Sequence, residues 1–434
     1  MEIIRLQRNR ITEIKLVFLV FGYFFRFIIF KGTILETILD SSSVVFLIML
    51  VKLVFDKQYC KHVIRTFKSW YIQKILIWYF LIFIIALIIC LKEILFTYLD
   101  IGFLKTWILV GIQIIVGVFV YSYIKQVNGN VLNAVIGAFI LQACIQLLSF
   151  MNPLIWEVLN CFRTESVILR SGSIRGMSLD RYDYFNLACG YSLLYVILVF
   201  RWSKWREKEY SKKIVGLVLL IYGGLASART SMVILVFAFV ACVVKRIIQK
   251  ERRIKFKNIC YIVCFIIFIV WLVNYAIKMY QPAKQMFDFL FIHIINFVSK
   301  GEYTNPSTRQ LFGEMYFAIE PSAWLFGEGH YLNENGGYYR NTDAGYMRMI
   351  LYGGIFISLL LFRFQLLFID VKKSNKIDKL EKIFIVGIVL ILNIKGIVIG
   401  CQQLMLSMIL LIYLSDKDRN ILEKIADKGK LCVS

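Results

Sequence analysis

Three arginines of this 434-residue sequence lie next to small residues or in a polar segment, where a guanidinium group has room to contact a ligand. Arg229 lies in the run Gly-Gly-Leu-Ala-Ser-Ala-Arg-Thr-Ser at 223–231, Arg175 precedes a glycine, and Arg309 lies in a long polar segment. A guanidinium presents a planar fork of donors that matches two phosphate oxygens. We therefore expect Arg229, Arg309 and Arg175 to bind a phosphate or pyrophosphate group.

For Arg229 and Lys395, a structural role without any ligand remains an alternative. An arginine at the edge of an apolar stretch also arises when its head group reaches for the membrane surface or pairs with a structural carboxylate, and Arg229 fits either case. Lys395, beside a glycine, is a flexible point charge. It fits phosphate binding or a simple surface position equally well.

Among the side chains of the polar segment 281–345 that can exchange a proton, four are candidates for a catalytic role: Glu314, Glu328, His330 and Asp343. A sugar hydroxyl is a poor nucleophile, so its attack benefits from a base that takes its proton. A pyrophosphate leaving group mainly needs cationic stabilisation. These four residues are the candidates for the catalytic base, and the sequence does not choose among them.

Amide, carboxylate and aromatic side chains that suit sugar recognition occur in the polar segments or where these segments join an apolar stretch. The candidates are Asn186, Asp183, Trp324 and Tyr346. The alternative for the segment before Asn186 is an ordinary solvated loop, in which Asp180 and Arg181 balance each other's charge.

The sequence predicts neither a metal site nor a bound cofactor. Gly327 and Gly329 lack the third glycine of a dinucleotide-binding fingerprint and follow no strand of a nucleotide-binding unit. The ten cysteines show no Cys-x-x-Cys spacing. Asp416 and Asp418 form the one clear Asp-x-Asp pair, which we interpret as a solvated charge cluster on a tail.

The elements that must position these residues are apolar. Hydrophobic residues make up 59% of the chain, and runs such as 76–90 and 259–276 contain no charged residue. Runs of this kind are typical of membrane helices. The composition therefore predicts an all-α, polytopic membrane protein with a single transmembrane domain over residues 1–434.

The net charge of +23 is concentrated in particular loops, which argues against a nucleic-acid partner. Five segments hold 26 of the 51 lysines and arginines: 1–15, 56–74, 202–213, 245–257 and 370–383. The positive-inside rule places these segments in the cytoplasm. The polar loops 152–184 and 281–345 carry as many acidic as basic residues or more, and we expect them outside.

About twelve membrane spans fit between these anchors, with both termini and the tail 416–434 in the cytoplasm. The predicted spans are 16–31, 38–55, 75–96, 105–124, 131–151, 185–201, 214–227, 230–244, 258–280, 346–369, 384–399 and 402–415. The pairs 214–227 with 230–244 and 384–399 with 402–415 form short hairpins, so their outer tips lie near the membrane boundary.

The order of these motifs resembles the O-antigen polymerase (Wzy-type) family of bacterial polysaccharide membrane proteins, to which O-antigen ligases are related. The resemblance rests on the Arg-Gly loop before Asn186, the Ser-x-Arg-Thr hairpin tip at Arg229, and Arg309 followed by a Gly-x-Gly tract. Asp343-x-Gly-Tyr346 before a span completes the pattern. It covers most of the chain in topology but only short patches in motif.

The resemblance implies a metal-independent glycosyltransferase in the bacterial cytoplasmic membrane. Such an enzyme joins oligosaccharide units carried on undecaprenyl pyrophosphate at the outer face, alongside a flippase and a chain-length regulator. Arg229, Arg309 and Arg175 would then neutralise pyrophosphate, and His330 falls near a histidine that ligases use as a base. A ligase and a flippase or transporter remain the alternatives. The candidate ionisable residues lie mainly in the outer loops and few lie deep within the spans, which favours transfer over transport.

Overall fold

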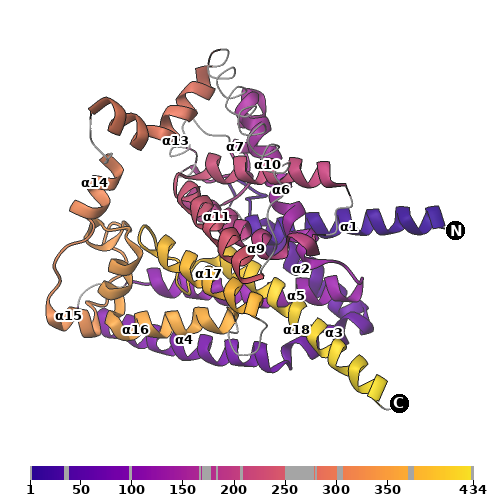
Figure 1. The fold of residues 1–434 in the computed structure, drawn as a ribbon. Coiled ribbons are helices and arrows are strands. Elements are labelled where there is room, and N and C mark those ends of the chain that lie inside the picture. The colour runs from indigo at the N-terminus through magenta and orange to yellow at the C-terminus, as the bar shows by residue number, and fades with distance from the viewer. Residues whose placement is uncertain are drawn as a thin grey trace.

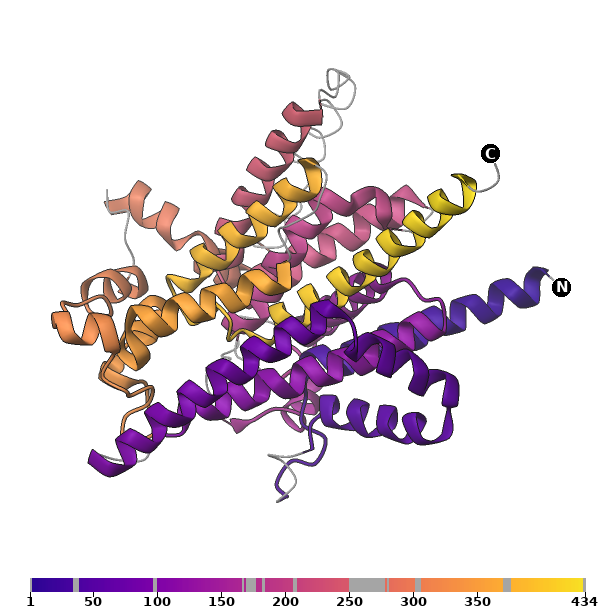
Figure 2. The ribbon, with the colours of Figure 1, turned by 90° about the horizontal axis from the view of Figure 1, so that it is seen from below.

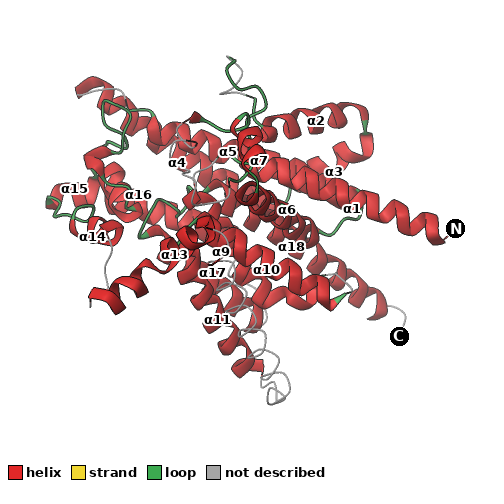
Figure 3. Cartoon of the chain, turned by 90° about the horizontal axis from the view of Figure 1, so that it is seen from above, coloured by secondary structure: helices red, strands yellow, loops and turns green. Residues whose placement is uncertain are grey.

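The computed structural model describes residues 2–33, 39–96, 100–165, 168, 177–181, 184–205, 209–249, 278, 281–300, 306–369 and 376–431. Within these ranges the regular structure is helical, and two isolated β-bridges are the only extended pairings (Figures 1 and 3). The predicted all-α fold is therefore confirmed for the described part of the chain.

Eleven long or medium helices form the bundle: α1 (Glu2–Phe25), α2 (Ser41–Phe55), α4 (Trp70–Phe96), α5 (Gly102–Gln126), α6 (Val131–Met151), α9 (Tyr184–Arg201), α10 (Tyr210–Ser227), α11 (Thr230–Gln249), α16 (Gly345–Ile369), α17 (Lys376–Asn393) and α18 (Gln403–Leu431). Six of them, α4, α5, α6, α9, α11 and α16, are long and apolar enough to cross a membrane. These six are the expected signature of a helical membrane protein.

Each of these eleven helices overlaps one predicted span, and the twelfth span, 258–280, falls outside the described residues apart from Lys278. The boundaries differ at two informative places. The helix α1 ends at Phe25 rather than at 31, because Arg26 has a backbone φ of 50° and leaves the helical path. The helix α17 ends at Asn393 rather than at 399, and the following loop lines a cavity described below.

The two polar loops contain further helices. In the first, α7 (Pro153–Asn160) begins at Pro153, and the Asn152 side chain caps the helix by accepting the backbone N–H of Leu154. The second carries α13 (Gln281–Lys300), α14 (Pro306–Gly313) and α15 (Pro321–Phe326). Met286 and Leu290 of α13 pack against Ala226 at the end of α10, so this loop folds back onto the bundle.

Side-chain caps fix where several helices begin. The Asp40 carboxylate accepts the backbone N–H of Ser43 at the start of α2, and Asn130 does the same for Asn133 in α6. Asp56 caps α3 (Lys57–Phe67), the amphipathic helix that connects α2 to α4 and packs on α5. Such caps satisfy donors that have no partner within the helix.

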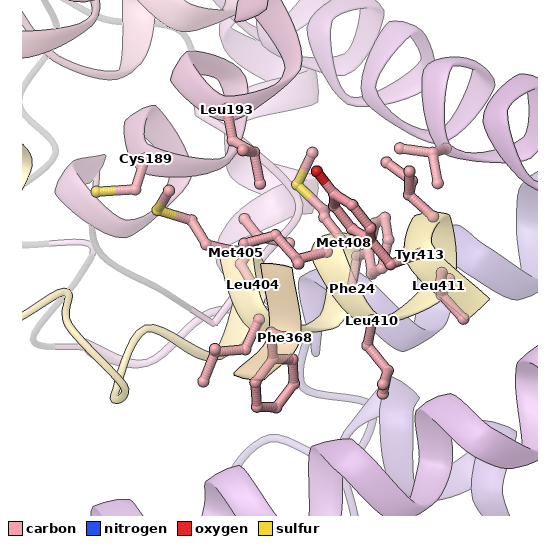
Figure 4. Close-up of a cluster of buried hydrophobic side chains, with 14 of the residues drawn as sticks. Phe24, Cys189, Leu193, Phe368, Leu404, Met405, Met408, Leu410, Leu411 and Tyr413 are labelled. Atoms are coloured by element: carbon pink, nitrogen blue, oxygen red, sulfur yellow. The ribbon is translucent and has the colours of Figure 1, made fainter. Parts of the chain in front are cut away.

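The first half of α18 forms the centre of the bundle. Residues 404–414 are almost completely buried on all sides, and they contact α1, α5, α6, α9 and α16. Figure 4 shows Leu404, Met405 and Met408 between side chains of other helices, including Cys189 and Phe368. A helix that is apolar all around is stable only in such a position.

The two chain ends lie at the same end of the bundle, and α14 and α15 lie at the opposite end (Figure 2). The two terminal regions are thus separated from the polar segment 306–345 along the bundle. The cavities described below lie near the second of these ends.

The helix α16 is broken at Gly353 and Gly354, where α15 packs against it. Gly354 has φ +65°, and a Cβ atom there would overlap the Leu325 carbonyl group of α15. Gly327 approaches the same break, since a Cβ there would overlap the backbone of Gly353. Glycine is required because only backbone fits between the two elements.

We predict that Gly354→Ala lowers the free energy of unfolding by roughly 1–3 kcal/mol, because alanine is strained at positive φ and overlaps α15. Thermal unfolding of the purified protein in detergent measures the change. Gly313→Ala is the matched control, since no atom lies within 4 Å of a Cβ at Gly313. Equal effects of the two substitutions would contradict the assigned role of the break.

Candidate functional site

A polar cavity of about 610 Å³ lies between the ends of several helices. Five basic side chains and one carboxylate line it: Arg26, Lys105, Arg181, Arg348, Lys395 and Asp343. Amides contribute as well, from Asn186 at the start of α9 and from Gln402 and Gln403 at the start of α18. With this excess of positive charge, the basic cavity suits an anionic ligand.

One wall of the basic cavity is held by the carboxylate of Asp40, which is 1% exposed. Arg26 donates to it through both Nε and Nη2 at 2.7 Å, and Nη1 of Arg26 reaches the Gln403 side chain at 2.7 Å. An Arg181 nitrogen lies 3.6 Å from the same carboxylate. The ends of α1 and α18 and the segment before α9 therefore meet at one buried anion.

The alternative of a solvated loop, in which Asp180 and Arg181 balance each other's charge, does not hold for Asp180. Asp180 lies 3.6 Å from Arg163, and both side chains are fully buried. The Gln142 amide of α6 donates to the other oxygen of Asp180. The side chains of Asp180 and Arg181 thus point to different partners. Asp180 meets Arg163 and Gln142, whereas Arg181 reaches Asp40 and the cavity.

A second wall is the irregular segment 394–402 between α17 and α18. The Asn393 side-chain oxygen accepts the backbone N–H groups of Val398 and Ile399, and Gln365 accepts that of Gly400, which has φ +69°. Irregular backbone inside a membrane protein is tolerated where protein groups satisfy it and where it lines a cavity. This segment presents Lys395 and Gln402 to the cavity.

The third wall comes from the polar segment before α16. The buried Asp100 carboxylate accepts the backbone N–H groups of Tyr331 and Leu332, fixing this segment to the start of α5. Arg348, 7% exposed, stacks between the rings of Tyr331 and Tyr338, with its guanidinium carbon 4.0 and 4.2 Å from the two centroids.

A second cavity, of about 510 Å³, adjoins the first and is mainly apolar. Its lining includes Val233, Val236 and Leu290, and both valines lie on an outer face of α11 that is exposed over most of its length. Arg229 stands at this apolar cavity, with its guanidinium carbon 4.6 Å from the Phe289 ring centroid. Asp343 and Lys395 line both cavities and mark their boundary.

The structure thus brings four predicted site residues to these cavities: Arg229, Asp343, Lys395 and Asn186. Gln402 donates from its amide to the side-chain oxygen of Asn186 at 3.2 Å, which orients that amide. Arg175 and Asp183 lie outside the described residues.

Six other predicted residues line neither cavity. Glu314 and Arg309 are exposed at α14, Trp324 is exposed on α15, and the Tyr346 hydroxyl donates to the Leu390 carbonyl oxygen. Glu328 pairs with Arg340 at 2.8 Å and accepts a hydrogen bond from Tyr339, whose ring lies 5.0 Å from that of the buried His330. Burial and the bond to Glu328 raise the pKa of the Tyr339 hydroxyl.

Sequence reasoning missed Arg348, Arg26, Arg181 and Lys105 as lining residues. A signal for Arg348 exists, since it lies three residues inside the apolar stretch of α16, where a cation is costly and therefore informative. Arg26 carries the same signal. No local pattern marks Arg181 or Lys105, because only the folded chain turns them to the cavity.

The interpretation of Asp416 and Asp418 as a solvated cluster is also wrong. Asp416 pairs with Arg201 at 2.7 Å, and Arg201 also binds the buried Glu381 at 2.8 Å. Asp418 binds Lys125 and Tyr121 of α5. These carboxylates hold α18 against its neighbours at the end of the bundle remote from the basic cavity.

Comparison with known proteins finds no matching family model, no similar curated protein and no similar solved structure. The site is therefore interpreted from its own geometry.

We predict that Asp40→Asn lowers the free energy of unfolding by about 3–5 kcal/mol, because it leaves the buried Arg26 without its counterion. Thermal or denaturant unfolding in detergent measures the loss. In the exposed Glu209–Lys212 pair, Glu209→Gln changes stability by less than about 1 kcal/mol. A small loss in Asp40→Asn would show that the cavity wall does not depend on this carboxylate.

Proposed function

We propose that the protein is a polymerase that joins oligosaccharide repeat units carried on undecaprenyl pyrophosphate into a surface polysaccharide. The observation that carries this proposal is the pair of adjoining cavities with a shared boundary at Asp343 and Lys395. A ligand with an apolar chain, a polyanionic head and a polar glycan matches the apolar cavity, its cationic boundary and the basic cavity, in that order.

The proposed orientation follows from the charges. In the proposed topology, twelve spans put both termini on the same side, and the positive-inside rule makes that side the cytoplasm. The cavities then open at the outer face of the bacterial cytoplasmic membrane. Both chain ends lie at the end of the bundle opposite to α14 and α15, which supports this arrangement (Figure 2). The exposed apolar face of α11 borders the apolar cavity, so a prenyl chain entering it stays in contact with lipid.

The proposed reaction is a displacement at the anomeric carbon of the donor sugar. A hydroxyl oxygen of the acceptor sugar forms the new C–O bond, the bond from the anomeric carbon to the pyrophosphate oxygen breaks, and the electron pair leaves with undecaprenyl pyrophosphate. The Asp343 carboxylate takes the hydroxyl proton, because it is the carboxylate lining the cavities in the described part of the chain. Arg229 and Lys395 stabilise the leaving pyrophosphate.

Two other predicted groups fit around this reaction. Asn186, oriented by Gln402, offers an amide to sugar hydroxyls in the basic cavity. His330 and Glu328 contact Tyr339 and its neighbours instead of the cavities, so we assign them to the support of the segment before α16. A flippase and a chain-length regulator are the proposed partners of the enzyme.

We predict that Arg229→Ala abolishes long-chain polysaccharide in cells while single repeat units still accumulate on the lipid carrier. Loss of charge-assisted hydrogen bonds to the leaving group slows transfer by roughly 10- to 100-fold. Asp343→Asn slows it by about 10²- to 10⁴-fold, the usual effect of a missing base. Gel analysis of polysaccharide and mass spectrometry of lipid-linked sugars measure both results.

Matched controls are Lys284→Ala and Glu334→Gln, which remove an exposed cation and an exposed carboxylate that line neither cavity. Both controls should make polymer of normal length at normal protein levels. Normal chain length in Arg229→Ala and Asp343→Asn would remove the two residues from the reaction.

The same reaction with purified protein separates a polymerase from a ligase. We expect lipid-linked repeat units alone to be extended into a ladder of longer lipid-linked products. Products that form only when a different, non-prenyl acceptor is supplied would show a ligase. Movement of the lipid-linked unit across vesicles without transfer would show a flippase.

A further inference from the structure

Arg348 is a buried cation whose charge no side chain neutralises in the part of the chain that the structure describes. Its Nε is buried without a hydrogen-bond partner, and no carboxylate oxygen of a described residue lies within 4.0 Å of its nitrogens. By contrast, the other strongly buried arginines, Arg26, Arg163 and Arg201, each lie at an aspartate or glutamate. A buried charge without a counterion is costly, so a counterion is expected from outside the chain.

The two tyrosine rings hold Arg348 in place without cancelling its charge. Tyr331 is itself fixed by Phe103, at a centroid distance of 5.6 Å, and by Tyr352 at 6.1 Å. Burial raises the pKa of Tyr331 to about 12, so this ring stays a neutral phenol at physiological pH. Tyr338 on the other face is 39% exposed. The guanidinium is thus oriented toward the cavity by stacking.

The position of Arg348 separates it from the boundary between the cavities. Arg348 and both tyrosines line only the basic cavity, whereas Lys395 also lines the apolar one and Arg229 lines the apolar one alone. A pyrophosphate attached to a prenyl chain must stay next to the apolar cavity. The group that reaches Arg348 therefore belongs to the glycan.

We propose that Arg348, between Tyr331 and Tyr338, is a specificity site that binds an acidic sugar of the repeat unit, through a carboxylate or a phosphate substituent. This inference rests on the proposed function, because it takes the ligand of the basic cavity to be a lipid-linked glycan. The tyrosine rings provide faces on which a sugar ring can pack beside the ion pair. The repeat unit of this enzyme is accordingly anionic.

The test uses the purified full chain in detergent at constant ionic strength, with three probes: tri-galacturonic acid, neutral maltotriose and inorganic pyrophosphate. Thermal shift titrations report each affinity. We expect tri-galacturonic acid to stabilise the wild-type protein and maltotriose to have no comparable effect. Arg348→Gln should weaken binding of the acidic trisaccharide about tenfold or more and change pyrophosphate binding less than about twofold.

Lys105→Gln is the matched control, since it removes an exposed cation from the same cavity. It should weaken acidic trisaccharide binding less than about threefold, as is usual for exposed charges. An effect as large as that of Arg348→Gln would overturn the proposal, because general positive potential would then explain binding. If Arg348→Gln does not fold, Arg348→Lys replaces it, and full retention of binding in that variant would also overturn the proposal.

Two further outcomes decide against the site. Absence of tri-galacturonic acid binding to the wild-type protein overturns it directly. Equal loss of pyrophosphate and tri-galacturonic acid binding in Arg348→Gln overturns it as well, because Arg348 then serves the pyrophosphate. Failure of the proposed polymerase is recognised separately, by normal polysaccharide in Arg229→Ala and Asp343→Asn cells.

Discussion

Asp40 is the buried anion around which the basic cavity is organised. It caps α2, receives Arg26 from the end of α1, and draws Arg181 from the segment that leads into α9. One carboxylate thus faces two guanidinium groups. Arg26 also donates a hydrogen bond to the Gln403 side chain, which links the end of α1 to the start of α18. Unpaired ions inside an apolar bundle are costly, so this carboxylate holds the helix ends together. Because two guanidinium groups face it, net positive charge remains beside it.

The same principle divides the molecule into two ends. At the end remote from the cavities, the buried cation Arg201 is paired directly, with Glu381 and Asp416. Around the basic cavity, cations outnumber carboxylates. Matched charge holds helices together, whereas unmatched charge is available to a ligand. The central helix α18 connects the two ends, since its first residues reach Arg26 and Asp416 lies farther along it.

The helices themselves were predictable, because long apolar runs leave little choice of structure. Their ends were less so. Arg26 and the loop after Asn393 terminate two helices through tertiary contacts, with Asp40 in one case and with backbone groups of 398–399 in the other. The site was predictable only where local sequence carried a signal, as at Arg229 and Asp343. The partners of Asp180 and Arg181 required the fold, since adjacent residues point in different directions.

The boundary shared by Asp343 and Lys395 separates two routes out of the proposed enzyme. If the proposed function holds, a spent prenyl carrier next to the apolar cavity would leave laterally along α11, whereas a glycan in the basic cavity would be held by that cavity's cations and amides. Polymer length then becomes a ratio of two rates, that of adding a unit and that of glycan release. Salt screens the ionic contacts of a glycan in the basic cavity more than the apolar contacts of the prenyl chain. Salt would therefore change the rate of glycan release, and with it processivity, more than the rate of the individual transfer step.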